Sequence, residues 1–161
     1  MKLHKLLVPV DFSRCSKTAF NYSKLIAKKF SASIYLLHVV DKRHVEKIAE
    51  INGESEDEVS KKLSLKARKY LERFLANNDS EGLVAEKIIR VGIPFQAIAL
   101  RAQALGADMI VMGGHGRVGN GQIDKIFFGS AAERVVRLLP CPVLCVPQED
   151  VDTETGEKEK L

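Results

Sequence analysis

Glycines gather in one short stretch of the sequence, at Gly113, Gly114, Gly116, Gly119 and Gly121. They follow an apolar run typical of a buried strand, and the pair Gly129-Ser130 comes shortly afterwards. Because glycine has no Cβ, backbone N–H groups in such a loop can point at an anion, and a Gly-Ser pair that opens a helix adds further donors. The pattern indicates a phosphate-binding loop. From spacing alone, glycines that only turn the chain, with Ser130 as a helix cap, are an equal alternative.

Two common phosphate motifs do not fit this loop. A Walker A loop needs G-K-[ST] after its glycines, and none follows here. Gly114, Gly116 and Gly119 match the dinucleotide pattern G-x-G-x-x-G, but that pattern belongs after a domain's first strand, with an acid about 20 residues on. In this chain the glycines follow the fourth expected strand, and residues 135–139 hold no acid.

Strand-like and helix-like segments alternate around the loop. The apolar runs predict strands over residues 6–10, 33–40, 85–91, 109–112 and 141–146. Helices are expected after Ser13, after the capping box Ser55/Glu58, from Pro94 to Gly106, and over 130–139. The polar segment 41–54 fits either a short helix or a mobile excursion. The expected apolar face of the first helix is Ala19, Tyr22, Ile26, Ala27 and Phe30.

This alternation predicts a parallel sheet with helices on both faces. Ligands of such sheets bind beyond the carboxyl ends of the strands. In this chain those ends carry Asp11, residues 39–41, residues 92–94 and the Gly113 loop. We therefore expect any binding site to be built from these four stretches.

Composition favours one globular domain that stays in the cytoplasm. The chain has 161 residues, 45% of them hydrophobic and 29% charged, without an apolar run long enough to span a membrane. Its start lacks the features of a secretory signal. Three cysteines are too few for a disulfide scaffold, and Cys141 and Cys145 should share one face of a strand as buried thiols.

Charge is distributed unevenly along the chain. Residues 148–161 contain six acids and two lysines, a net charge of −4, whereas the whole chain carries +4. The prediction is a domain over residues 1–147 followed by a disordered tail over 148–161. The remaining cations are scattered among acids, and tryptophan is absent. Nucleic acid is therefore an unexpected partner.

Six segments in order resemble the universal stress protein family, in its ATP-binding subgroup. They are Val8-Pro9-Val10-Asp11-Phe12-Ser13, Leu36-Leu37-His38-Val39-Val40-Asp41, Val91-Gly92-Ile93-Pro94, residues 107–113, Phe128-Gly129-Ser130, and residues 141–146. The resemblance implies one α/β domain of the adenine nucleotide alpha hydrolase-like fold, with a five-stranded parallel sheet in the order 3-2-1-4-5. It also implies a homodimer formed through the last strand; the protein partner, if any, is unknown.

The resemblance further implies which residues bind ATP. Pro9, Val10 and Asp11 would line the nucleoside, and Val39 would contact the adenine through its backbone. Met112 and Gly113 would approach the ribose and phosphates, and the triphosphate would lie against Gly116, Gly129, Ser130 and Ala131. Asp11 could also hold Mg²⁺ through water, besides capping a helix.

One spacing departs from the family. The family's signature is G-x2-G-x9-G-[ST], but twelve residues separate Gly116 from Gly129 when the motif starts at Gly113. Starting it at Gly116 and Gly119 restores the spacing. Strand-end geometry favours Gly113 and Gly116, with an insertion over 118–121 that either lengthens the loop harmlessly or moves its N–H groups away from the ligand.

The residues with catalytic chemistry have no clear partners. His38 lies within an apolar strand, which favours a core histidine, and no carboxylate is identified that would orient His115 or activate Ser130. We therefore assign no catalytic residue. The expected function is an ATP-binding, stress-response signalling dimer. The alternatives are an interaction module whose insertion has disabled the site, and a slow ATPase or phosphotransferase that uses His115 or Ser130.

Overall fold

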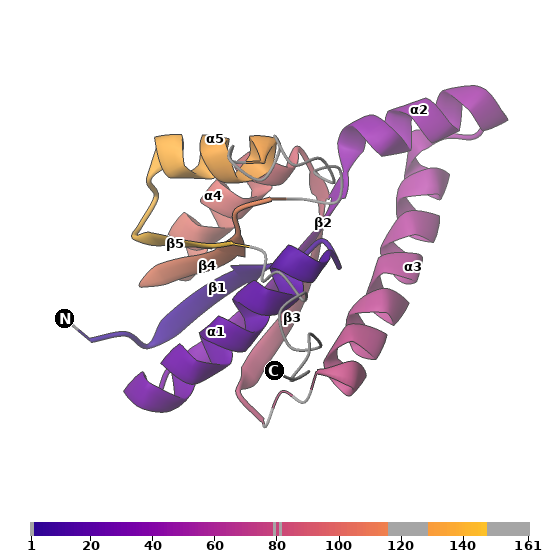
Figure 1. Cartoon of the computed structure of the whole chain (residues 1–161). Coiled ribbons are helices and arrows are strands. Elements are labelled where there is room, and N and C mark those ends of the chain that lie inside the picture. The colour runs from indigo at the N-terminus through magenta and orange to yellow at the C-terminus, as the bar shows by residue number, and fades with distance from the viewer. Residues whose placement is uncertain (1, 79, 81, 116–128, 148–161) are drawn as a thin grey trace, which may run out of the picture.

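A computed structural model of the chain describes residues 2–78, 80, 82–115 and 129–147. Its strands form one parallel sheet in the order β3-β2-β1-β4-β5, as predicted (Figure 1). The strands are β1 (Lys5–Pro9), β2 (Ser33–Asp41), β3 (Val84–Gly92), β4 (Met109–Gly113) and β5 (Val143–Val146). The helices are α1 (Arg14–Phe30), α2 (Lys42–Asn52), α3 (Glu56–Asn77), α4 (Pro94–Leu105) and α5 (Ser130–Leu138).

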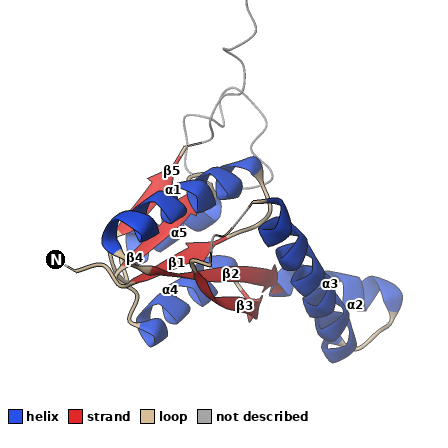
Figure 2. Cartoon of the chain, turned by 90° about the horizontal axis from the view of Figure 1, so that it is seen from below, coloured by secondary structure: helices blue, strands red, loops and turns tan. Residues whose placement is uncertain are grey.

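Helices cover both faces of the sheet (Figure 2), and a hydrophobic cluster lies on each face. On one face, Phe20 of α1 and Leu71 and Phe74 of α3 pack on the strands. On the other, Ile98 of α4 and Val135 of α5 do so. Burial of these side chains stabilises the fold by roughly 1.5–3 kcal/mol each. Helices α2 and α3 also pack on each other around a third cluster beside the end of β2.

The expected helix ends are confirmed. Ser13 accepts a hydrogen bond from the N–H of Ser16 at the start of α1, and Ser55 and Glu58 form a reciprocal capping box at α3. Pro94 begins α4, and Gly106 ends it with a φ of 61°. These short-range signals therefore set where the connecting turns lie.

Two expectations about helices need comment. Tyr22 and Phe30 are 43% and 51% exposed, so their assignment to the buried face of α1 is wrong. The buried side of α1 consists of Phe20 and of small side chains such as Ala19, Ser23 and Ala27. The polar segment after β2 folds as α2, the short-helix alternative.

The cysteines of the last strand segment share one face as expected, but they are half-buried and not fully buried. Cys141 and Cys145 both pack against the cluster under α4 and α5, half-buried. Burial raises the pKa of both thiols, which keeps them protonated at neutral pH. No helix in the described ranges is long and apolar enough to cross a membrane.

Candidate functional site

The end of β4 is hydrogen-bonded to both β5 and α5. Gly114 donates its N–H to the carbonyl oxygen of Val146 at 2.8 Å, and its own carbonyl accepts from Gly129 at 2.7 Å. Beside it, a Cβ on Gly113 would lie 2.8 Å from the Sγ and 2.9 Å from the carbonyl carbon of Cys15. Only glycine therefore fits at this strand end, and residues 113 and 114 hold the start of α5 next to the sheet.

Helix α5 begins without a side-chain cap. Gly129 is its N-cap residue and has no side chain to offer, and the first bond within the helix runs from Glu133 N–H to the Gly129 carbonyl at 3.0 Å. The N–H groups of Ser130, Ala131 and Ala132 precede that bond, so they lack intrahelical partners. A helix start of this kind presents donors and a positive dipole end, an arrangement suited to an anion.

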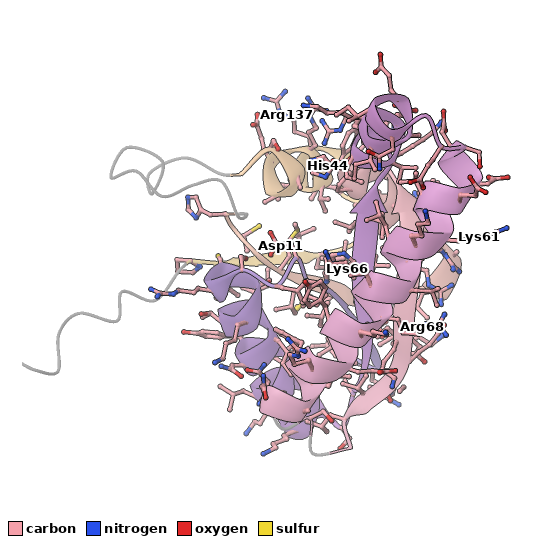
Figure 3. The ribbon with its side chains drawn as sticks, turned by 90° about the vertical axis from the view of Figure 1, so that its right-hand side faces the viewer. Asp11, His44, Lys61, Lys66, Arg68 and Arg137 are labelled. Carbon is pink, nitrogen blue, oxygen red and sulfur yellow. The ribbon has the colours of Figure 1, made fainter. Side chains whose placement is uncertain are left out.

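Asp11 lies where β1 ends and α1 begins. Its Oδ1 accepts the N–H of Ser13 at 3.0 Å, and between them Phe12 adopts a φ of 65°. This left-handed conformation is uncommon for a residue with a side chain, and it turns the chain sharply. Figure 3 shows Asp11 between α1 and α5.

Strand β2 continues past the end of β1, so its last residues have backbone groups that face no partner strand on the β1 side. The N–H of Val10 donates to the Leu37 carbonyl at 2.8 Å, so the backbone groups of Leu37 point toward β1. Because these groups alternate in direction along a strand, those of Val39 point the same way. At that level β1 has already ended at Pro9. The Val39 N–H and carbonyl therefore face the space above Pro9, where a planar heterocycle could pair with them.

His38, on β2, contacts the residues of the Asp11–Phe12 turn. Its Nδ1 lies 2.8 Å from the Val10 carbonyl oxygen, and its ring stacks on Phe12 with centroids 4.6 Å apart. Its Nδ1 therefore has a backbone partner, but the side chain is half-buried and does not lie in the hydrophobic core. These contacts connect β2 to the Asp11 turn.

His115 carries an unusual polar atom. Within the described ranges its Nε2 is buried without a hydrogen-bond partner, a property that it shares there with Arg101 Nε. A buried polar atom without a partner costs free energy unless something binds it. His115 directly follows Gly113 and Gly114, so this polar atom belongs to the start of the glycine loop.

Asp41, the carboxylate at the end of β2, is already paired. Asp41 caps α2 through the N–H of Arg43, whose guanidinium holds the pKa of the carboxyl below its usual value. Within the described ranges, no group of three or more His, Cys, Asp or Glu residues could hold a metal by itself. A cation here would need ligands from a bound molecule, with Asp11 as the nearby carboxylate.

The structure brings most of the predicted site residues to one edge of the sheet. Those described are Pro9, Val10, Asp11, Val39, Met112, Gly113, Gly129, Ser130 and Ala131, at the ends of β1, β2 and β4 and the start of α5. Gly116, the insertion over 118–121 and the tail lie outside the described residues. The contact of Cys15 with Gly113 and Val146 was not predicted, because no local pattern links residues so far apart in sequence.

Taken together, the fold is a doubly wound α/β domain with a helix start that has no side-chain cap at the carboxyl edge of its sheet. The model of the universal stress protein family matches residues 2–147, and the chain belongs to this family. Universal stress protein MJ0577 of Methanocaldococcus jannaschii is 31% identical over 158 residues, covering 91% of this chain and 96% of that protein. A solved structure of MJ0577 superposes with a TM-score of 0.79, covering 93% and 99% of the two chains.

A more distant structure shares the fold. A universal stress protein from Archaeoglobus fulgidus, solved in complex with dAMP, has a TM-score of 0.57 at 20% identity and covers 91% of this chain and 99% of its own. At that identity the likeness shows the fold alone.

Proposed function

We propose that this chain binds ATP, with Mg²⁺, at the carboxyl edge of its sheet. The observation that carries the proposal is the bond from Gly129 N–H to the Gly114 carbonyl, which fixes an uncapped helix start beside a glycine loop. The free N–H groups of Ser130 and Ala131 would hold phosphate oxygens, together with Gly113 and Gly116. The buried Nε2 of His115 offers a further polar contact.

The base and ribose would lie toward β1 and β2. The backbone groups of Val39 match the donor and acceptor on the adenine edge, above Pro9 and Val10. Met112 and Asp11 would border the ribose, and Asp11 would hold Mg²⁺ through a water that the phosphates also coordinate. The dAMP complex of the Archaeoglobus relative is consistent with an adenine nucleotide, although the argument rests on the residues of this chain.

An added carboxylate at the helix start tests the phosphate site. In Ser130→Asp the new charge suits the helix dipole but repels the phosphates, so ATP affinity measured by calorimetry should fall by about tenfold or more. Ser130→Ala keeps the backbone N–H and should bind within a few-fold of the wild type. The matched control is Gln96→Asp, an exposed position in the first turn of α4. Equal ATP affinity in Ser130→Asp and Gln96→Asp would contradict the proposal.

The nucleotide held by the purified protein gives a direct check. Mass spectrometry after denaturation should find ATP or another adenine nucleotide in wild-type protein and much less in Ser130→Asp. If none is retained and Mg-ATP does not raise the melting temperature, the chain is instead an interaction module of its family with a disabled site.

We also propose that the chain is a cytoplasmic, stress-response signalling homodimer joined through β5. Within the described ranges β5 pairs with β4 along one edge only, and Leu144 on it is 36% exposed. An open strand edge favours pairing with another chain. Leu144→Glu should give a monomer in sedimentation, while Leu100→Glu, at an exposed position on α4, should not. A dimer that survives Leu144→Glu would rule out this interface.

A further inference from the structure

Helix α3 carries different charges on its two exposed sides. Its cations at positions 62, 66, 69 and 73 follow the spacing i, i+4, i+7 and i+11, so they share one side of the helix. No acid interrupts that row. Lys61 and Arg68 lie on the other side, in a row that includes Glu72. Lys62 is already paired with Glu54, at 2.6 Å. The basic part of this side is therefore the stretch that carries Lys66, Lys69 and Arg73.

The basic side faces the Asp11–Phe12 turn. The Nζ of Lys66 lies 5.8 Å from the centre of the Tyr70 ring, and that ring lies 5.9 Å from the ring of Phe12. Figure 3 shows Lys66 on the side of α3 nearer to Asp11, with Lys61 and Arg68 on the opposite side. The basic row thus borders the turn that ends β1.

Helix α1 adds further positive charge to this surface. Its Phe20 ring packs 5.4 Å from the ring of Phe74, and Lys24 Nζ donates to the Asn78 carbonyl at 2.8 Å, so α1 flanks the same side of α3. Lys17 lies two turns before Lys24 on α1 and is exposed. We call Lys17, Lys66, Lys69 and Arg73 the α1–α3 basic face.

The chain itself contains an acidic segment, whose charge is opposite to that of the α1–α3 basic face. Residues 148–161 carry a net charge of −4, against +8 for residues 1–147. This segment follows Pro147 directly, and the preceding residue touches α1: Val146 accepts a hydrogen bond from Cys15 Sγ at 3.2 Å. Fourteen residues can span up to about 46 Å, whereas a helix is about 10–12 Å wide. The segment starts beside α1 and is long enough to cross it.

We propose that the acidic segment 148–161 docks on the α1–α3 basic face of its own chain. Its carboxylates pair with the exposed cations, so the contact is weak, favoured by the short tether and reduced by salt. Docking places negative charge next to the Asp11–Phe12 turn. This inference does not depend on nucleotide binding, because neither surface includes the glycine loop or the start of α5.

Carbodiimide cross-linking of the full-length protein tests the contact. The reagent joins a carboxylate to a neighbouring amine, and mass spectrometry of the digest then locates each link. Links from Glu149, Asp150, Asp152, Glu154, Glu157 or Glu159 should reach Lys17, Lys66 and Lys69 in preference to Lys61, and should fade in 1 M salt. In a mixture of isotope-labelled and unlabelled protein, the links should join segments of the same label.

Charge reversal provides the matched comparison. Lys66→Glu with Arg73→Glu should lower links to the retained amines Lys17 and Lys69 by about fourfold, since each exposed pair contributes roughly a factor of two. Lys61→Glu with Arg68→Glu reverses two charges on the other side of α3 and should leave those links unchanged. Equal losses in both variants, links spread evenly over exposed lysines, or links mainly between differently labelled chains would each overturn the proposal.

Discussion

Gly114 donates its backbone N–H to the carbonyl oxygen of Val146 over 2.8 Å, and that same oxygen accepts the thiol of Cys15 over 3.2 Å. One acceptor at the end of β5 therefore joins the glycine loop to the first turn of α1. Since Gly129 in turn donates to the Gly114 carbonyl, these bonds link four segments: the start of α1, the end of β4, the start of α5 and the end of β5.

The close contact at Gly113 predicts a large stability difference between two glycines. In Gly113→Ala the new Cβ would lie 2.9 Å from a backbone carbon of Cys15, so the backbone must move, and the free energy of unfolding should fall by about 1–3 kcal/mol. Gly92→Ala is the control, because its Cβ would meet Ala97 Cβ at an ordinary 3.6 Å and should change stability by less than about 0.5 kcal/mol. Urea unfolding monitored by circular dichroism measures both. Similar values for the two variants would contradict the crowding argument.

The left-handed conformation of Phe12 predicts an unusual order of stability for the alanine and glycine variants at this position. Both Phe12→Ala and Phe12→Gly lose the ring contacts with His38, Tyr70 and Phe74, so both should be less stable than the wild type. However, alanine keeps the unfavourable φ of 65° and glycine does not. The glycine variant should therefore be about 1 kcal/mol more stable than the alanine variant, the reverse of the usual order. Thermal unfolding of the two proteins decides it, and an alanine variant as stable as the glycine variant would be the contrary result.

Asp108 predicts a contribution to stability that disappears in acid. Its carboxylate accepts the N–H groups of His4 and Lys5 at 2.8 and 2.9 Å, which lowers its pKa from the ordinary 3.8. A carboxyl whose pKa is lower in the folded state stabilises the fold above its unfolded pKa and loses that effect as the pH falls. Wild type should therefore be more stable than Asp108→Asn at pH 7, and the gap should narrow below about pH 4. Urea midpoints at several pH values measure this gap, and a gap that widens in acid would refute the assignment.

Local signals in the sequence predicted the elements well and their packing less well. Ser13, Ser55 with Glu58, and Pro94 act within one helical turn of their own positions, so their roles could be recognised without the fold. Tyr22 shows the limit, because helical periodicity identifies an apolar stripe but not how much of it the sheet covers. The exposed part of that stripe depends on residues elsewhere in the chain.

For the candidate site too, some residues could be predicted from the sequence and others could not. Asp11 and Gly113 could be predicted because each directly follows a recognisable strand, and parallel strands end at one edge. The contacts of Cys15 with Gly113 and of His38 with Val10 join distant segments, so they needed the three-dimensional arrangement. The spacing between Gly116 and Gly129 stays a prediction of two alternative registers, because that loop lies outside the described residues.

The charge of Asp11 should decide how strongly Mg²⁺ promotes ATP binding. In Asp11→Asn the amide oxygen can still accept the N–H of Ser13, so the turn is preserved while the negative charge is lost. A charged acceptor contributes about 1 kcal/mol more than a neutral one, so the ratio of ATP affinities with and without Mg²⁺ should fall by about fivefold. The control is Asp41→Asn, which likewise keeps its helix-capping bond, to the N–H of Arg43, at the end of the neighbouring strand. Calorimetry with ATP in Mg²⁺ and in EDTA measures both ratios. If the ratio of ATP affinities with and without Mg²⁺ is smaller in Asp41→Asn than in Asp11→Asn, the metal lies at the end of β2. That result would exclude Asp11 as its ligand.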